Sequence, residues 1–381
     1  MKALPIIDMS EVTRLTKAGR LAEAMAILRR GVAATNGSMS GAASGGVGGG
    51  GADQVTPEAM RAFLDRFGKL APHARLGGLP GSLRPPAPLP DGARFEERTF
   101  SSGTGNLGYK LYIPSSYEAQ ESVSLVIMLH GCTQSPDDFA AGTRMNALAE
   151  EQSFLVAYPA QTQAANASKC WNWFRTEDQQ RDRGEPALIA GVTRQVVDDF
   201  RVDPKRVYVA GLSAGGAAAA VMGAAYPDLY AAVGVHSGLA CGAARDLPSA
   251  FAAMRQGGTI SAPGVPGARR PQRAVPTIVF HGDSDTTVHS VNGDQVIIQA
   301  KGATPLRQTQ SRGVSAGGMA YTRTVQSDES GRPVLEQWIL HGAGHAWSGG
   351  SSDGSYTDPR GPDASREMLR FFSEVRTPSA L

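Results

Sequence analysis

The chain has 381 residues, of which 41% are hydrophobic and 19% charged, and its formal net charge is +2 at pH 7. This length and this balance predict a folded domain with a full hydrophobic core and argue against disorder over most of the chain. Lysine and arginine are scattered, with adjacent pairs only at 29–30, 205–206 and 269–270, so we expect no nucleic-acid partner. No stretch approaches the roughly 18 apolar residues of a membrane-spanning helix, so no transmembrane segment is expected.

Residues 1–35 are predicted to form a helical hairpin. Asp8 and Glu11 have the spacing of a capping box, and Leu21, Met25 and Leu28 form the apolar stripe of a second helix. A hairpin this small cannot bury its apolar face alone, so we expect it to dock on the rest of the chain or on a second subunit. The apolar run 3–7 is too short for a secretory signal, and a cytoplasmic location is therefore expected.

Residues 36–92 are predicted to form a linker that is rich in glycine and proline. Residues 41–51 are mostly glycine, which is typical of a flexible tether, and no Gly-Lys-Ser/Thr follows them to indicate a phosphate-binding loop. Residues 56–67 allow one short helix, and the proline-rich stretch 80–90 is typical of a semi-rigid spacer. The main domain is therefore expected to span residues 93–381.

A Gly-x-Gly-x-x-Gly pattern occurs at Gly103, Gly105 and Gly108. In a dinucleotide site this pattern opens a helix, whereas here it leads into residues 109–113, which alternate as a strand does. We therefore predict a hairpin turn at these glycines and expect no cofactor.

The apolar run Arg206–Ala210 leads into Gly211–Gly215, which reads Gly-Leu-Ser-Ala-Gly, and an alanine-rich segment follows. This context predicts a strand, a sharp turn and a helix. Such a turn holds its serine in a strained conformation with the hydroxyl exposed above the sheet edge. A chance match is the alternative in a chain rich in Gly, Ala and Ser, but the flanking elements argue against it, and we predict that Ser213 is a nucleophile.

A serine nucleophile needs a base within hydrogen-bond reach and an acid that orients the base. A predicted strand at 275–280 is followed by Asp283 and Asp285, and a second at 334–340 is followed by His341 and His345. The resulting order of serine, aspartate and histidine is that of the α/β-hydrolases.

The choice within each loop follows from position. Asp285 lies further beyond its strand than Asp283 and has room to point back across the sheet, so Asp285 is predicted and Asp283 is the reserve. His345 lies among small residues and is predicted as the base, whereas His341 is nearer the strand end and is expected to pack or hydrogen-bond. Structural roles are also expected for three other histidines, namely His236, His281 and His289.

The charge that develops on the attacked carbonyl needs donors, which are usually backbone amides. The continuous apolar run Leu125–Leu129 predicts a strand buried on both faces, and His130–Gln134 follows it. Cys132 and Thr133 are candidates for their amides at this turn. The predicted oxyanion hole combines the amide of Cys132 with that of Ala214, the residue after the nucleophile.

Four motifs together resemble the poly(3-hydroxybutyrate) depolymerase family of esterases. The resemblance covers about residues 93 to 375, and related feruloyl and acetylxylan esterases share much of the pattern. The motifs are His130–Gln134, Cys170–Phe174, Gly211–Gly216 and Gly344–Gly350. The resemblance implies an α/β-hydrolase fold with a mostly parallel central sheet, and it places the catalytic triad on Ser213, Asp285 and His345.

The function that this resemblance implies is a serine esterase, a carboxylic ester hydrolase that cleaves polyhydroxyalkanoate polymer or oligomer through an acyl-enzyme. A feruloyl or acetylxylan type of carbohydrate esterase is the alternative. A third possibility is a non-catalytic granule-binding protein, in which the hairpin 1–35 docks on a polymer granule surface. The family also has many extracellular members, so that location is the alternative to the cytoplasm, and the oligomeric state stays open.

Aromatic residues near these loops are candidates for substrate contact, because amphipathic rings line grooves for apolar or phenolic groups. Trp347, two residues from the predicted base, is the first candidate. For Trp173, core packing and substrate contact are equally favoured. The other expected substrate contacts are Trp171, Thr133 and Ser348.

Three cysteines, Cys132, Cys170 and Cys241, leave at least one unpaired in a monomer. Two lie in the motifs named above, so a bridge between them is conceivable, but a cytoplasmic chain would keep them reduced. The pairing therefore stays open. No metal is expected, because His341 and His345 lie on a glycine-broken loop without a Glu between them.

Overall fold

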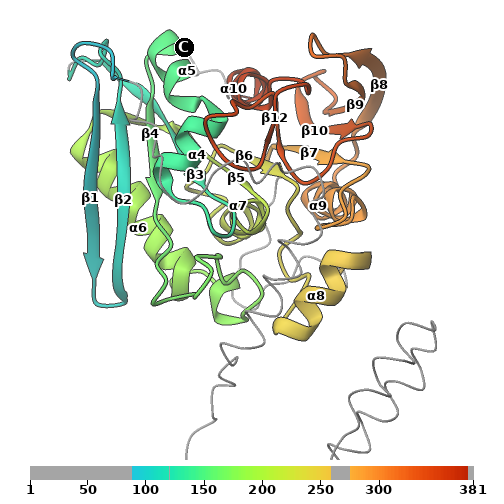
Figure 1. Ribbon diagram of the computed structural model, residues 1–381, viewed down its shortest axis with the longest axis horizontal. Coiled ribbons are helices and arrows are strands. Elements are labelled where there is room, and N and C mark those ends of the chain that lie inside the picture. The colour runs from blue at the N-terminus through green and yellow to red at the C-terminus, as the bar shows by residue number, and fades with distance from the viewer. Residues whose placement is uncertain (1–87, 120, 259–274, 376–381) are drawn as a thin grey trace, which may run out of the picture. The chain divides into compact units, whose positions relative to one another are not determined.

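The computed structural model describes residues 88–375 of the chain, apart from residue 120 and residues 259–274 (Figure 1). The predicted hairpin of residues 1–35 and most of the linker 36–92 lie outside the described residues. In chain order, the described elements are β1 Arg94–Ser102, β2 Gly105–Ile113, β3 Val123–Leu129, α4 Pro136–Thr143, α5 Met145–Gln152, β4 Leu155–Pro159, the 3-10 turn η1 Glu177–Gln179, α6 Gly184–Asp199, β5 Val202–Leu212, α7 Ala214–Ala225, β6 Ala232–His236, α8 Leu247–Gln256, β7 Thr277–Gly282, α9 Val291–Lys301, β8 Arg307–Val314, β9 Ala320–Ser327, β10 Pro333–Leu340, β11 Trp347–Ser348, β12 Thr357–Asp358 and α10 Ala364–Glu374.

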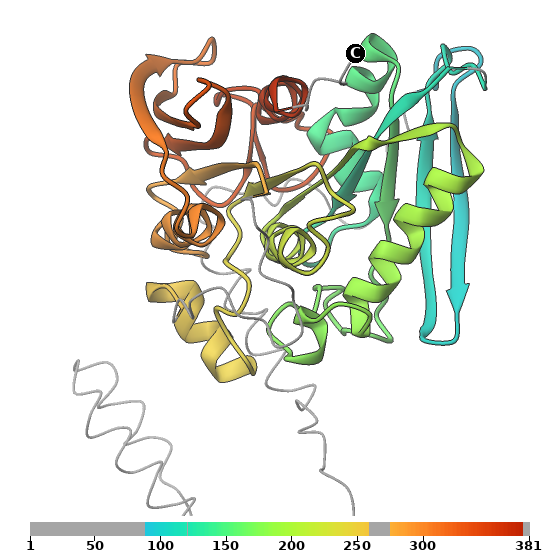
Figure 2. The same cartoon turned by 180° about the vertical axis from the view of Figure 1, so that it is seen from behind.

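One sheet runs through the domain, with strand order β1-β2-β4-β3-β5-β6-β7-β10-β9-β8. The central pairs, from β4 to β10, are all parallel, whereas the pairs at both edges are antiparallel. The hairpin β1–β2 forms one edge and the hairpin β8–β9 the other (Figures 1 and 2). The prediction of an α/β-hydrolase fold with a mostly parallel centre is confirmed.

The glycine pattern near residue 105 lies in a hairpin, as predicted. Ser102 at the end of β1 pairs with Gly105 at the start of β2. Gly105 has a φ of 136°, a backbone conformation that favours glycine. No helix follows, so the pattern belongs to a turn between antiparallel strands.

Helices cover both faces of the sheet, and strand β3 shows why. Successive side chains of a strand point to opposite faces. Leu125 and Ile127 join a buried cluster that includes residues of α6, α7 and α9. Val126 and Met128 join a second cluster with residues of α4, α5 and α10. Burying an aliphatic side chain of this size stabilises the fold by roughly 1.5–3 kcal/mol, so a strand that is apolar on both faces requires helices on both.

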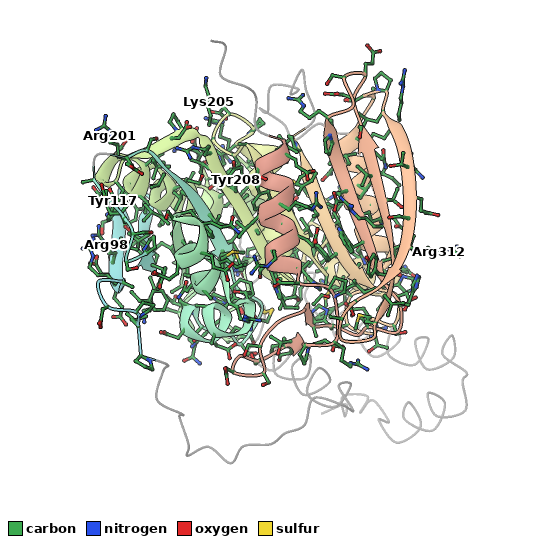
Figure 3. The ribbon with its side chains drawn as sticks, turned by 90° about the horizontal axis from the view of Figure 1, so that it is seen from above. Arg98, Tyr117, Arg201, Lys205, Tyr208 and Arg312 are labelled. Carbon is green, nitrogen blue, oxygen red and sulfur yellow. A yellow bond between two sulfur atoms is a disulfide. The ribbon has the colours of Figure 1, made fainter. Side chains whose placement is uncertain are left out.

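Helix α10 closes one face near the end of the chain (Figure 3). The Asp363 side chain caps the helix by accepting from the Arg366 amide at 3.0 Å. Phe372 of α10 stacks on Tyr208 of β5 with ring centroids 4.6 Å apart. Within the described ranges, no helix is long and apolar enough to cross a membrane.

The parallel strands determine where the chemistry gathers. Because β3, β5, β7 and β10 run in the same direction, their carboxyl ends meet at one edge of the sheet. The segments that follow these strands carry Cys132, Ser213, Asp285 and His345, respectively. Four segments far apart in sequence are thereby brought to the same edge.

Candidate active site

Ser213 forms a sharp turn between β5 and α7. Its φ of 59° and ψ of −118° are uncommon for a residue other than glycine, and such strain is retained mainly at functional sites. Two glycines make the turn possible, because a Cβ on Gly215 would collide with the Leu129 carbonyl and one on Gly211 would collide with the Gly215 carbonyl. The Ser213 amide donates to the His236 carbonyl at 2.9 Å, which fixes the turn on the neighbouring strand.

Asp285 and His345 form a buried pair. Oδ2 of Asp285 lies 2.8 Å from Nδ1 of His345, and Oδ1 accepts from the amides of Thr287 and Val288, both at 2.9 Å. Burial alone would raise the pKa of Asp285, but the charge and hydrogen bond of His345 outweigh it and lower that pKa to about 2. An ionised carboxylate that accepts from Nδ1 leaves Nε2 free to take a proton.

The reserve carboxylate, Asp283, pairs with the other histidine. Its Oδ2 lies 2.9 Å from Nδ1 of His341, and Nε2 of His341 lies 2.9 Å from the Thr322 hydroxyl. The side chains of Asp283 and His341 are 40% and 41% exposed. Each aspartate therefore hydrogen-bonds a different imidazole, and His341 has the hydrogen-bonding role that was one of the two expected of it.

Two other histidines of this sheet edge are buried and act structurally. Burial lowers the pKa of His236 to about 3, and its Nε2 accepts from the Ser348 amide at 3.0 Å. The ring of His236 stacks on that of Trp347. Burial likewise lowers the pKa of His281, whose Nε2 donates to the Val288 carbonyl at 2.8 Å. Both side chains are held neutral by their surroundings.

The turn after β3 presents one unpaired amide beside the nucleophile. The Gly131 amide donates to Oε1 of Gln134 at 2.9 Å, and the Thr133 amide donates to the Ser168 carbonyl at 2.7 Å. Among the described residues, no partner is found for the amide of Cys132. Of the two amides considered from the sequence, that of Thr133 is therefore unavailable and that of Cys132 is available.

Ala214 supplies a second amide. It is the first residue of α7, and the first helical hydrogen bond runs from the Ala217 amide to the Ser213 carbonyl. The amides before Ala217 have no partner within the helix, and the positive end of the helix dipole adds to their attraction for an anion. The available amides of Cys132 and Ala214 are the two that the sequence indicated.

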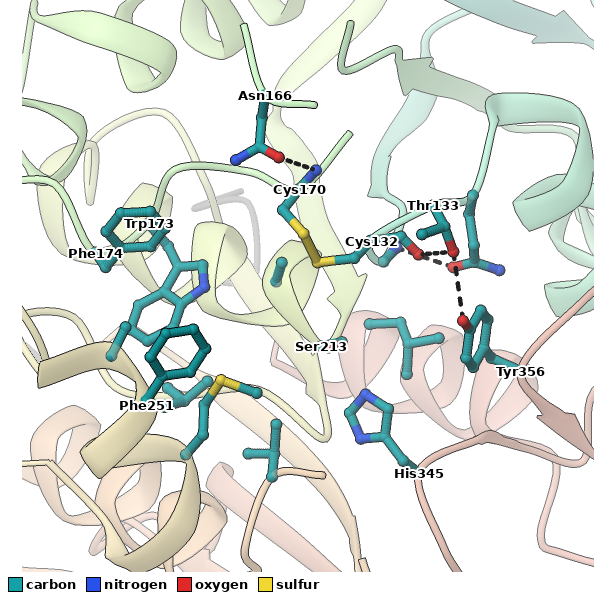
Figure 4. A pocket seen from close by; sticks show the side chains of 18 of the residues that line it. Cys132, Thr133, Asn166, Cys170, Trp173, Phe174, Ser213, Phe251, His345 and Tyr356 are labelled. Atoms are coloured by element: carbon teal, nitrogen blue, oxygen red, sulfur yellow. Dashed lines mark hydrogen bonds between the residues drawn. A yellow bond between two sulfur atoms is a disulfide. The ribbon is translucent and has the colours of Figure 1, made fainter. Parts of the chain in front are cut away.

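Ser213 and His345 line one pocket with a volume of about 250 Å³ (Figure 4). Among the described residues, no hydrogen bond joins the Ser213 hydroxyl to the His345 imidazole. Catalytic hydrogen bonds often tighten only when substrate binds. Most of the wall is apolar, and its apolar side chains include those of Trp173, Phe174, Leu239, Leu247, Ala250, Phe251, Met254 and Val288.

A disulfide joins Cys132 to Cys170 in the wall of this pocket. It links the turn after β3 to the segment that carries Trp173 and Phe174 (Figure 4), whereas Cys241 is free and buried. The pairing that the sequence left open is thus the one between the two motif cysteines. Within the described part of the chain, no cluster of His, Cys, Asp and Glu is arranged to hold a metal ion.

The structure corrects three of the expected substrate contacts. Trp347 is 1% exposed, and its Nε1 donates to the Ser365 hydroxyl at 3.1 Å. Trp171 is fully buried, and its Nε1 donates to a backbone carbonyl at 3.1 Å. Ser348 is also buried, with its hydroxyl on the Pro362 carbonyl at 2.7 Å. None of the three lines the pocket. Their polar atoms have hydrogen-bond partners inside the core, and burial of the two tryptophan rings stabilises that core.

Some of the other residues that line the pocket were considered from the sequence, and others were not. Thr133 lines the pocket, as predicted, and so do Trp173 and Phe174. The sequence did not single out Phe251 of α8 or Tyr356. The apolar stripe of helix α8 is typical of ordinary core packing, so it did not indicate that Phe251 lines a pocket. Tyr356 did offer a signal, because it is an aromatic residue within a loop of Gly, Ser and Asp.

The buried carboxylate of Glu185 holds a segment of the pocket wall in place through hydrogen bonds. Oε1 of Glu185 accepts from Gln161 Nε2 at 2.5 Å and from Asn172 Nδ2 at 2.6 Å, and Oε2 accepts from the Asn172 amide at 2.7 Å. Gln161 Nε2 also donates to the Cys170 carbonyl at 3.1 Å. Glu185 therefore holds the segment between the disulfide and Trp173. Burial and the nearby charge of Asp178 raise the pKa of Glu185 to about 7, despite these hydrogen bonds.

We expect Glu185→Gln to change how stability depends on pH. The folded-state pKa lies above the ordinary value of 4.5, so between pH 4.5 and about 7 the folded chain holds a proton that the unfolded chain has released. Wild-type stability therefore falls as pH rises through this window. Glutamine does not titrate, so the variant does not lose this stability as pH rises. The Tm of the variant minus the Tm of wild type, measured by thermal unfolding, should therefore be higher at pH 8 than at pH 5.

The matched control is Glu151→Gln, which alters an exposed carboxylate paired with Arg366 at 2.8 Å. Its Tm difference from wild type should stay nearly constant between the two pH values. A constant difference for Glu185→Gln as well would mean that Glu185 does not titrate in this range, contrary to its burial beside Asp178.

Comparison with known proteins identifies the family. Residues 107–310 match the profile of the family described as esterase PHB depolymerase. Poly(3-hydroxyalkanoate) depolymerase C of Paucimonas lemoignei is 32% identical over 65% of this chain and 60% of its own length. Poly(3-hydroxybutyrate) depolymerase of Ralstonia pickettii is 27% identical over 68% of this chain and 56% of its own length. The chain thus spans a little over half the length of these two relatives.

Esterases of carbohydrate are also similar to the chain. An acetylxylan esterase of Coprinopsis cinerea is 26% identical over 68% of this chain and 71% of its own length. Among solved structures, the acetyl xylan esterase from Aspergillus awamori has a TM-score of 0.59 at 20% identity, over 74% of this chain and 99% of that one, a likeness of fold. Because the family profile covers more than half of the 381 residues, the chain belongs to the esterase PHB depolymerase family.

Proposed function

We propose that the chain is a serine esterase that hydrolyses polyhydroxyalkanoate polymer or oligomer through an acyl-enzyme. The observation that carries the proposal is the buried pair of Asp285 and His345, with 2.8 Å between Oδ2 and Nδ1, beside the pocket that the strained Ser213 also lines. A nucleophile, a base and an orienting acid at one pocket form the arrangement that acyl transfer requires.

In the acylation step, Oγ of Ser213 attacks the ester carbonyl while Nε2 of His345 takes the hydroxyl proton. The negative charge on the carbonyl oxygen is held by the amides of Cys132 and Ala214. Collapse of this intermediate breaks the bond to the alcohol, which leaves with the proton from His345. The ionised Asp285 stabilises the imidazolium throughout, because burial in this site strengthens their attraction.

In the deacylation step, a water molecule replaces the alcohol beside His345. Nε2 of His345 takes a proton from the water as its oxygen attacks the acyl carbonyl, and the same two amides hold the charge. His345 then returns the proton to Oγ of Ser213, which releases the acid and restores the enzyme.

Two observations support a polyester substrate. The pocket wall is predominantly apolar, and among its described lining residues His345 is the only one with a titratable imidazole, carboxyl or ammonium group, which suits a short alkyl acyl group. Two relatives are named as depolymerases of poly(3-hydroxyalkanoate) and poly(3-hydroxybutyrate). The acetylxylan esterase of Coprinopsis cinerea makes an acetyl ester on carbohydrate the competing substrate.

A hydrolysis panel tests the proposal, with 3-hydroxybutyrate trimer, acetylated xylan and a feruloylated sugar as substrates. Wild type should release 3-hydroxybutyrate from the trimer at a kcat/KM above those for the two carbohydrate esters. Preferred release of acetate or ferulate would assign the chain to the carbohydrate esterases. Binding to polymer without hydrolysis of any of the three would support the non-catalytic granule-binding alternative.

A further inference from the structure

Two hydroxyl groups from distant segments meet at the rim of the pocket. The Thr133 hydroxyl lies 3.3 Å from the Tyr356 hydroxyl, and both residues line the pocket that contains Ser213. We call Thr133 and Tyr356 the hydroxyl pair. Tyr356 is 42% exposed, one of four exposed large hydrophobic residues in the described part of the chain. An exposed phenol at the mouth of a largely apolar pocket is a candidate for substrate recognition.

Both members of the hydroxyl pair have a backbone conformation that their residue types rarely adopt. The φ angle is 68° at Thr133 and 53° at Tyr356, and for β-branched and bulky residues the left-handed region is strained. Hydrogen bonds hold each one there, from the Thr133 amide to the Ser168 carbonyl and from the Trp347 amide to the Tyr356 carbonyl, both at 2.7 Å. The surrounding structure thus maintains strain at the two positions whose hydroxyls meet.

The hydroxyl pair has unused hydrogen-bonding capacity. The Thr133 hydroxyl donates to the Cys132 carbonyl at 2.6 Å, so its contact with the phenol is a second, longer bond. At 3.3 Å this bond is well beyond the usual length for two hydroxyls. The Tyr356 hydroxyl can therefore turn from Thr133 to a substrate oxygen at little cost.

Two other polar side chains of the pocket wall, those of Gln134 and Asn166, are already engaged. Oε1 of Gln134 accepts from the Gly131 amide at 2.9 Å, and its Nε2 donates to Asp138 at 2.8 Å. Nδ2 of Asn166 donates to Asn172 at 3.0 Å. The indole of Trp173 is another lining donor, but it lies on the opposite side of Ser213 from Tyr356 (Figure 4). On the His345 side, the phenol of the hydroxyl pair is thus the lining group best placed to donate to a substrate.

The position of the base decides which half of the ester meets the hydroxyl pair. His345 must pass its proton to the departing alcohol, so the alcohol half lies on the His345 side of Ser213. In Figure 4, Tyr356 lies on that side, whereas Trp173 and Phe251 lie on the opposite side. The apolar wall is therefore placed to take the acyl half, and the hydroxyl pair is placed to take the alcohol half.

We infer that the hydroxyl pair is a subsite for an oxygen atom in the alcohol half of the ester, with Tyr356 as the donor and Thr133 as the residue that positions it. In a hydroxyalkanoate oligomer, this oxygen is the carbonyl of the next ester or the terminal carboxyl group. The inference rests on the proposed function and deepens it, because it makes Tyr356 a residue that distinguishes oligomers from esters of simple alcohols.

The test compares two substrates that share the 3-hydroxybutyryl acyl half. The alcohol half carries carbonyl oxygens in 3-hydroxybutyrate trimer, whereas in butyl 3-hydroxybutyrate it is a plain alkyl chain. Tyr356→Phe removes one neutral hydrogen bond, so the ratio of kcat/KM for trimer over kcat/KM for butyl 3-hydroxybutyrate should fall about three- to tenfold. The control Tyr321→Phe alters a tyrosine packed on Trp338, outside the pocket lining, and should leave both the ratio and the activity unchanged.

An unchanged ratio in Tyr356→Phe would overturn the subsite, even if both rates fell together, because equal losses indicate a structural role. Failure of the proposed function gives a different result, in which wild type hydrolyses acetylated xylo-oligosaccharide but not trimer. The subsite is then tested with the sugar ester in place of the trimer, since its alcohol half also carries oxygen atoms. For Tyr356→Phe, a three- to tenfold fall in kcat/KM for the sugar ester relative to kcat/KM for the butyl ester supports the subsite, and no fall overturns it.

Discussion

Ser213→Ala is expected to lower kcat for ester hydrolysis by roughly four to six orders of magnitude while the chain remains folded. Without Oγ no acyl-enzyme can form, and only binding and the oxyanion amides are left to assist the attack of water. Alanine keeps the Cβ of serine, and the glycines that make room for the turn are unchanged. We expect the Tm of the variant to lie within a few degrees of that of wild type, and kcat should be measured on 3-hydroxybutyrate trimer with active-site titration of the wild type.

Ser237→Ala is the matched control for this experiment. Ser237 follows β6, is fully buried, and also has a positive φ, 49°. Its hydroxyl lies 3.2 Å from Nδ1 of His236, and it does not line the pocket. We expect this variant to keep kcat within a few-fold of wild type. Comparable activity in Ser213→Ala and Ser237→Ala would remove Ser213 as the nucleophile.

Asp285→Asn is expected to lower kcat by about four orders of magnitude, whereas Asp283→Asn should lower it by no more than a few-fold. An amide at position 285 cannot stabilise the imidazolium of His345, and its NH2 group favours the wrong tautomer of the ring. Asp283 instead holds the exposed His341 at 2.9 Å. The pair of variants therefore separates two carboxylates that lie two residues apart. Equal losses of kcat in both would contradict the assignment of the orienting acid.

Asp285→Asn should also reduce the stability of the folded chain. The pKa of Asp285 is lowered from the ordinary 3.8 to about 2, so the folded chain releases this proton more readily than the unfolded chain does. The resulting stabilisation is fully present above pH 4 and is lost as pH falls toward 2. An asparagine side chain cannot carry the charge, and the Tm of Asp285→Asn at pH 7 should lie below that of Asp283→Asn.

The structure brings together the residues that the sequence indicated for the centre of the site, and the signals that indicated them are local. A turn of Gly-x-Ser-x-Gly between an apolar run and an alanine-rich segment has few other conformations, and the glycines are required by close backbone approach. Asp285 and His345 follow buried strands, and the parallel pairing of β7 with β10 brings the two segments together. Strand ends in a parallel sheet are thus predictable from apolar runs alone.

The pocket wall was less predictable, because it depends on packing between segments far apart in sequence. Trp347 is close to His345 in sequence, yet its ring packs on Phe139 at 5.5 Å in the core. Phe251 belongs to a helix whose apolar residues look like ordinary core. Sequence distance to a catalytic residue says little about the direction of a side chain.

The cysteine pairing could not be chosen from three positions, because a disulfide requires a particular separation and direction of the side chains. The structure brings the Cα atoms of Cys132 and Cys170 to 4.2 Å from each other. That approach depends on how the segment after β4 folds back on the turn after β3, which is a tertiary contact that no local pattern records.

The central claim is that Ser213, His345 and Asp285 act as one proton-relaying unit, and the most direct measurement is labelling by a fluorophosphonate, which reacts with activated serines. Mass spectrometry of the digested protein should show one adduct, on the peptide that contains Ser213. The labelling rate should fall by at least about 100-fold in His345→Ala, because the base that activates the hydroxyl is gone. An adduct on another serine, or a rate that His345→Ala leaves unchanged, would contradict the account.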